Sequence, residues 1–221
     1  SKNSFSSYSQ PNYHQFDIII NSLEEINLTT IEEAKRANAK RQSIELYENA
    51  KAINSKVKQA EFEVSHTDIS QDQLVFRVMT YDHIPDDHGR KKNPKTIADT
   101  KVKLNFPPFQ HWKFNSNKEL ICVGKSHWKN DVNNGEFCLT HGIATDKLAL
   151  MWLKLCDRYA TRGNVRGYTY NDEMKGQAIL QLTQIGLQFD EAKSSNPFAY
   201  YTAAVTNSFV RVINLEKRNQ N

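Results

Sequence analysis

The 221-residue sequence lacks the features that mark disulfide-rich, metal-binding and membrane proteins. Its three cysteines, Cys122, Cys138 and Cys156, are far apart and form no CxxC pair. This spacing argues against a disulfide framework or a closed zinc site and favours a reducing cytoplasm. No apolar run approaches the roughly 18 residues of a membrane span, and no basic-then-apolar signal segment is present. We therefore expect a soluble intracellular protein.

Glycine and apolar residues are also scarce. The chain has 8 glycines and 38% hydrophobic residues, whereas an average globular chain is roughly 45% apolar. We therefore expect extended helical surface rather than one large compact core. The formal net charge of +4 and pI near 8.8 permit a nucleic-acid partner but do not establish one. The length allows one large or two small domains, and we favour two.

Sequence motifs of the common enzyme classes are missing: there is no P-loop, GxSxG, HExxH or GxGxxG. The run DHIPDDHG holds four side chains that resemble metal ligands, namely His83, Asp86, Asp87 and His88. The alternative interpretation is an exposed turn whose polar side chains bond to their own backbone. We expect no enzymatic activity, no metal and no cofactor; a nuclease that uses this cluster would require metal-dependent cleavage.

The N-terminal portion is expected to combine a tail, a long helix and short strands. Residues 1 to 16 are rich in Ser, Asn, Gln and Tyr and predict a flexible tail. Thr30, with Glu33 three residues later, predicts a capped helix from about residue 31 to 58. Its apolar residues recur every three, four or seven positions and form one narrow stripe. The helix either packs this stripe against its own protein or a second copy, or uses it to bind a dedicated partner.

A strand and a basic segment follow the long helix. The alternation in QLVFRVMTY, from Gln73, predicts a strand. Arg90, Lys91 and Lys92 then cluster beside Gly89, and further lysines alternate with aromatic residues up to position 130. Such interleaving suits a nucleic-acid surface, because cations neutralise phosphate and rings stack on bases. A solvated loop and a small β unit whose aromatics form its own core would produce the same pattern.

Three amphipathic helices are predicted in the C-terminal portion, which we place at residues 144–221, after an N-terminal portion at 17–143. The first runs from about 145 to 161, the second from about 171 to 187, and the third begins at Pro197. The expected fold class is therefore mainly α: a C-terminal three-helix module preceded by an α+β portion with one long helix.

The most specific pattern lies in residues 166–221. An acidic helix start leads to a helix that ends in Phe-Asp, a polar turn follows, and an aromatic helix opens with Asn-Pro and closes with Glu-Lys. The motifs are GYT at 167–169, EM at 173–174, FD at 189–190, NPFAY at 196–200, Phe209, Arg211 and LEKR at 215–218. In order and spacing this stretch resembles region 2 of sigma factors, most closely the short late-transcription sigma factors of tailed bacteriophages.

The resemblance implies a division of labour between the last two helices. In sigma factors the second helix docks on the clamp coiled coil of the largest subunit of RNA polymerase. The corresponding positions here are Gly176, Gln177, Ile179 and Thr183. Housekeeping sigma factors usually carry charged or polar groups there, so Gly176 and Ile179 depart from the family pattern.

Promoter reading belongs, by the same resemblance, to the third helix. Tyr200 occupies the position of the aromatic residue that captures an unstacked base of the melted −10 element, and Asn207 the position that faces the duplex edge. Arg211, Lys217 and Arg218 would neutralise phosphates. The paired tryptophans of housekeeping sigma factors are Ala203 and Ala204 here, so melting by a wedge should be weaker. Alternatively, Tyr200 is a core aromatic and Asn207 a solvated helix residue.

The sequence thus predicts a phage-type sigma factor that binds bacterial core RNA polymerase and the −10 promoter element in the cytoplasm of an infected bacterium. Phage co-activator proteins are further candidate partners, and no membrane is expected. The alternative is a phage structural or DNA-packaging protein whose helices mediate assembly and whose basic segment contacts DNA.

Overall fold

The computed structural model describes residues 13, 15–89, 92–140, 142 and 144–219. It divides into two compact units. The α+β unit contains Ser7–Lys103 and Pro108–Leu139, and the helical unit contains Leu104–Pro107 and Thr140–Asn221. The short segment Leu104–Pro107, which the sequence placed in the N-terminal portion, therefore groups with the helices.

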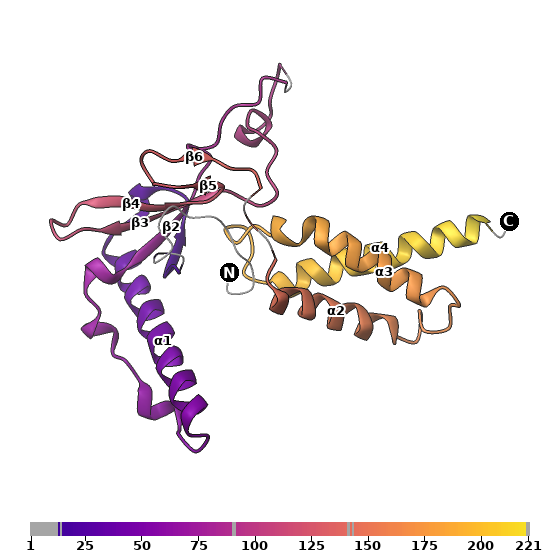
Figure 1. The fold of residues 1–221 in the computed structure, drawn as a ribbon, viewed down its shortest axis with the longest axis horizontal. Coiled ribbons are helices and arrows are strands. Elements are labelled where there is room, and N and C mark those ends of the chain that lie inside the picture. The colour runs from indigo at the N-terminus through magenta and orange to yellow at the C-terminus, as the bar shows by residue number, and fades with distance from the viewer. Residues whose placement is uncertain (1–12, 14, 90–91, 141, 143, 220–221) are drawn as a thin grey trace. The chain divides into compact units, whose positions relative to one another are not determined.

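A four-stranded sheet forms the centre of the α+β unit (Figure 1). Its strands are β1 (Ile18–Ile20), β2 (Val75–Met79), β3 (Phe109–Phe114) and β4 (Leu120–Lys125), in the order β1-β2-β3-β4. The first pair is parallel and the other two are antiparallel. A separate hairpin pairs β5 (Trp128–Lys129) with β6 (Glu136–Phe137). Short 3-10 turns lie at Leu23–Glu25, Gln59–Phe62, His66–Asp68, Gln71–Gln73 and Ile97–Asp99.

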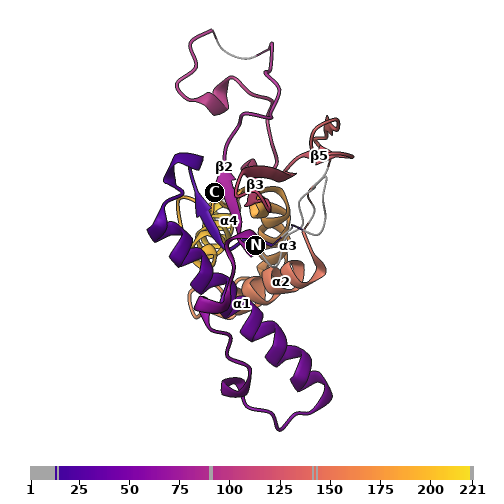
Figure 2. The same cartoon turned by 90° about the vertical axis from the view of Figure 1, so that its left-hand side faces the viewer.

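The long helix α1 spans Leu28–Ile53, and Figures 1 and 2 show it leading away from the sheet. It begins earlier than expected because Asn27, not Thr30, is the N-cap: its Oδ1 accepts from the backbone N–H of Thr29 and Thr30. Thr30 completes this capping box by accepting from the Asn27 N–H. The helix ends five residues before the expected 58, at Ile53.

Only the first half of α1 packs firmly on the sheet. Its buried residues are Ala34, Asn38 and Ala39, which join Ile20, Leu74 and other sheet-side residues in one core cluster. Farther along, Leu46 and Ile53 are 48% and 91% exposed. The apolar stripe predicted along the whole helix therefore contributes to the core of its own unit mainly through small residues near the start.

A buried carboxylate links β1, β2 and α1. The Asp17 side chain is fully buried, and its Oδ2 accepts from the Val75 N–H at 2.8 Å and from Asn38 Nδ2 at 3.1 Å. Its Oδ1 forms an ion pair with Arg41 at 2.9 Å. Burial raises the pKa of Asp17, although the hydrogen bonds and Arg41 oppose this effect. The neighbouring groups therefore offset only part of the cost of burying this carboxylate.

The predicted tail is wrong in its last residues. Phe16 packs against the Arg77 guanidinium, 3.8 Å from the ring centroid, and the Tyr13 carbonyl accepts from His111 Nδ1. His111 Nε2 in turn accepts from Arg77 Nε at 3.0 Å. Aromatic groups can offset the entropy of ordering here because the sheet offers them a buried cation. Residues 1–12 and 14 lie outside the described residues.

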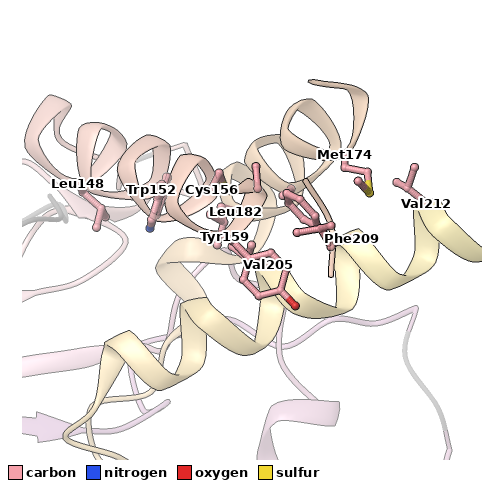
Figure 3. Close-up of a cluster of buried hydrophobic side chains, with 12 residues drawn as sticks. Leu148, Trp152, Cys156, Tyr159, Met174, Leu182, Val205, Phe209 and Val212 are labelled. Carbon is pink, nitrogen blue, oxygen red and sulfur yellow. The ribbon is translucent and has the colours of Figure 1, made fainter. Parts of the chain in front are cut away.

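Three helices make up most of the helical unit: α2 (Asp146–Ala160), α3 (Asn171–Ile185) and α4 (Pro197–Asn219), with a 3-10 turn at Gly186–Gln188. Thr145 caps α2 by accepting from the Leu148 N–H. The side chains that meet between the helices (Figure 3) are Leu148, Trp152, Cys156, Tyr159, Met174, Leu182, Val205, Phe209 and Val212. The helices α2 and α3 begin and end within two residues of the predicted bounds, and α4 begins at the predicted Pro197. This confirms a helical C-terminal portion preceded by an α+β portion.

Glycine is required where α3 meets α2. A Cβ at Gly186 would lie 2.0 Å from the Trp152 ring, so no other residue fits without moving the tryptophan.

None of the described helices is long and apolar enough to cross a membrane.

Candidate functional site

A groove of about 400 Å³ runs between α3 and α4 of the helical unit. Its walls carry amide, hydroxyl and charged groups over an apolar floor. The lining residues are Glu173, Gln177, Gln181 and Ile185 from α3, and Ala204, Asn207, Ser208, Arg211, Val212, Leu215 and Glu216 from α4. Polar groups that line one concave surface can recognise a ligand's hydrogen-bonding edge while the floor accepts its apolar part.

The α4 wall contains two of the predicted DNA-binding residues. Asn207 and Arg211 are both exposed and lie four residues apart, so they share one face of the helix. Arg218 lies seven residues beyond Arg211, two helical turns away. Lys217 and Arg218 are exposed in the last turn of α4. The helix thus presents an amide and cations along its length.

Tyr200 is not freely exposed. It is half-buried, its hydroxyl donates to the Ile185 carbonyl at 3.1 Å, and its ring centroid lies 5.5 Å from those of Phe189 and Tyr201. Burial raises the pKa of Tyr200. Because Ile185 also lines the groove, the tyrosine ties the start of α4 to the end of α3 beside one end of this groove.

The four predicted polymerase-binding residues separate onto two sides of α3. Gln177 lines the groove, close to the α4 wall that holds Asn207. Gly176, Ile179 and Thr183 lie three and four residues apart and share another face. Gly176 and Thr183 are exposed, whereas Ile179 is half-buried against the core. The Thr183 hydroxyl donates to the Leu180 carbonyl at 2.7 Å, so it is satisfied within the helix.

Only Gln177, Asn207 and Arg211 among the groove residues were predicted as site residues, and Gln181 and Ser208 are two of those that the sequence reasoning missed. Gln181 follows Gln177 by one helical turn, and Ser208 follows Asn207 directly. The four-residue spacing of the glutamines was a usable signal for Gln181. No sequence pattern indicated Ser208, because only the packing of α3 against α4 places its side chain in the groove.

The basic and aromatic segment largely builds the α+β unit itself. Lys101 pairs with Asp86 at 2.8 Å and Lys129 with Glu136 at 2.8 Å. Lys125 donates to the Val132 carbonyl and lies 4.6 Å from the Trp128 ring centroid. Phe109 is buried. These contacts favour the interpretation in which the aromatics form a local core.

The cluster Arg90, Lys91 and Lys92 is only partly described. Arg90 and Lys91 lie outside the described residues, and Lys92 is exposed. Their role in DNA binding therefore stays a prediction.

The histidines and aspartates of the DHIPDDHG run do not converge. His83 Nε2 donates to the Ser126 carbonyl at 3.0 Å, and its Nδ1 accepts from Gln110 at 3.2 Å. Burial lowers the pKa of His83 to about 4. Asp87 accepts from the Gly89 N–H, as expected for a turn. Among the described residues, no group of three or more His, Cys, Asp or Glu side chains is placed to hold a metal ion.

Cys122 and Cys156 show no sign of activation. Burial raises the pKa of Cys156 to about 11 and raises that of Cys122. A reactive cysteine needs a lowered pKa, because the thiolate is the nucleophile. Both thiols therefore stay protonated near neutral pH.

Comparisons with protein-family models, with curated proteins and with solved structures found no match to this chain.

Proposed function

We propose that this chain is a phage-type sigma factor that binds bacterial core RNA polymerase and reads the −10 promoter element. The observation that carries the proposal is the face of α4 on which Asn207 and Arg211 border the groove, with Tyr200 at its end. These side chains occupy the positions that the resemblance to sigma region 2 assigns to promoter reading. The helical unit also supplies the paired helices that such a division of labour requires.

The chemistry of the α4 face fits single-stranded and duplex DNA. A tyrosine ring can stack on any base, and stacking contributes roughly 1 to 3 kcal/mol per base. An amide such as that of Asn207 can pair with adenine through two hydrogen bonds. Arg211, Lys217 and Arg218 can neutralise phosphates along the helix. Ala204 lines the groove with a small side chain, and a larger residue at this position would fill part of the groove.

Polymerase binding is assigned to α3. Gln177 and Thr183 are exposed, so their side chains can meet a partner without disturbing the core. Replacing both with glutamate places one charge on each of these two sides of α3 and should weaken the complex without unfolding the helical unit. Asn164→Glu is the matched control, because Asn164 is exposed in the connection before α3.

Binding to core polymerase, measured by gel filtration and interferometry, tests the proposal. We expect a stable complex with native protein, weaker binding after Gln177→Glu with Thr183→Glu, and native binding after Asn164→Glu. The proposal fails if native protein shows no detectable core binding.

A further inference from the structure

The outer face of α2 carries a line of positive charge. Lys147, Lys154 and Arg158 are exposed and follow one another at intervals of seven and four residues, so they lie on one face of the helix. Figure 3 shows the buried side chains of α2 directed toward α3 and α4, on the opposite face. Eleven residues of helix separate the first of these cations from the last, which is about 16 Å. We name these three residues the α2 basic stripe.

The turn after α2 adds two exposed cations directly behind the stripe. Arg162 follows Arg158 by four residues, and its guanidinium lies over the Tyr159 ring, 4.5 Å from the centroid. The Arg162 carbonyl accepts from the Arg166 N–H at 2.9 Å, so Arg166 comes one turn of chain later, where it is exposed. The positive charge therefore continues beyond the end of the helix.

The excess positive charge of the helical unit is confined to this region. Residues 146–166 carry five Lys and Arg but only two Asp, a net charge of +3. The other residues of 140–221 carry five basic and five acidic side chains and have no net charge. Asp157 pairs with Lys175 of α3, and none of the three stripe cations forms an ion pair with another described residue. The charge of the stripe is therefore available to a partner.

The helix itself gains little from basic residues at these positions. The helix dipole favours acidic residues in the first turn and basic residues in the last. Lys147 lies in the first turn, and only Arg158 lies in the last. Lys154 and Arg158 are four residues apart, where like charges destabilise a helix. A polyanion on this face would relieve that repulsion.

We propose that the α2 basic stripe binds the phosphate backbone of double-stranded DNA without reading its bases. This contact goes beyond the proposed function, which assigns DNA to α4 and polymerase to α3. A DNA duplex carries one negative charge per roughly 1.7 Å of its axis. A straight line of cations about 16 Å long therefore meets phosphates in every register along the duplex.

The chemistry of the stripe favours duplex DNA over other polyanions. Interfaces between proteins are depleted of lysine and enriched in aromatic residues, whereas interfaces with DNA are rich in positive charge. Proteins that bind single strands stack bases on aromatic rings, but Tyr159, the ring next to Arg158, is only 6% exposed. Both functions considered for this chain, promoter recognition and DNA packaging, involve double-stranded DNA.

The salt dependence of binding to a short DNA duplex of unrelated sequence, measured by fluorescence anisotropy without polymerase, tests the stripe. Lys147→Gln, Lys154→Gln and Arg158→Gln combined should lower the slope of log K against log salt by about 2.7, because each neutralised phosphate contributes about 0.9. The loss should be the same on a second duplex of different sequence, since phosphates carry no sequence information. The Tm should stay close to that of the native protein, because glutamine resembles lysine and arginine in helix propensity.

A matched variant separates the stripe from the net charge of the protein. Lys51→Gln, Lys56→Gln and Lys58→Gln combined remove the same charge from exposed positions near the end of α1 and just after it. This variant should keep the native slope. An equal fall in both variants would attribute the effect to net charge and overturn the proposal.

Other results would also overturn the proposal. An unchanged slope in the stripe variant would show that α2 does not contact phosphates. Loss of binding to a single-stranded oligonucleotide or to polyglutamate, with native binding to the duplex, would assign the stripe to a single strand or to an acidic protein. Tighter binding of an RNA duplex than of DNA would replace DNA as the occupant. Failure of any of these tests leaves core polymerase binding untouched, so it is distinguishable from failure of the proposed function.

Discussion

Substitutions at Tyr200 can separate base stacking from packing. Tyr200→Phe keeps the ring and its contacts with Phe189 and Tyr201 and loses only the hydrogen bond to the Ile185 carbonyl. One such bond contributes about 1 kcal/mol, so open complex should fall about fivefold at most. Tyr200→Leu keeps apolar bulk but has no π face. Loss of a stacked base then costs roughly 1 to 3 kcal/mol and should reduce open complex about ten- to a hundredfold.

Permanganate footprinting of the −10 region, alongside a core-binding assay, measures the effect. Tyr200→Ala is expected to abolish opening while sparing polymerase binding, but it also removes packing between α3 and α4, so the leucine variant is the sharper test. Phe198→Leu is the control, because Phe198 is 65% exposed two residues earlier in α4. Equal thymine reactivity in Tyr200→Leu and native complexes would show that Tyr200 only packs.

Three further outcomes are expected. Reversing the basic residues 90–92 to glutamate should lower DNA affinity and flatten its salt dependence, since fewer counterions are released; an unchanged salt slope would assign the segment to other contacts. Asp17→Ala should destabilise the α+β unit by about 3 kcal/mol in urea denaturation, because it leaves buried partners uncompensated, whereas exposed Glu48→Ala should be neutral. Burial lowers the pKa of His127 to about 3, so the folded state binds fewer protons than the unfolded chain below pH 6.5. His127 should therefore contribute a fall in stability of about 2 kcal/mol between pH 7 and 5. A His127→Asn variant should lose this share and keep the share of His83, whose pKa burial lowers to about 4; a slope equal to that of the native protein would exclude His127 as a cause.

The C-terminal helices could be predicted because their signals are local. Capping by Thr145, the Pro197 start and the three- and four-residue spacing of apolar residues all act within one or two helical turns. The α1 bounds were less accurate, because two candidate caps stand three residues apart and the structure uses Asn27.

The basic and aromatic segment shows why other features could not be predicted. The sequence permits either a nucleic-acid surface or a local core, because lysines alternate with aromatic residues in both. The choice depends on partners distant in the chain, such as Asp86 for Lys101 and Tyr13 for Lys113. Such pairs form only when strands from separate segments align.

By itself, the sequence determined the long helix, the strand that begins near Gln73 and the three C-terminal helices, because caps and periodicity act within a few residues. Only the tertiary structure decided that Gln177 and Asn207 line one groove and that Tyr200 bonds to the Ile185 carbonyl. The physical reason is that a face acquires neighbours only through packing between helices. The way two helices pack depends on the side chains of both, so it cannot be predicted from the residue pattern of one helix alone.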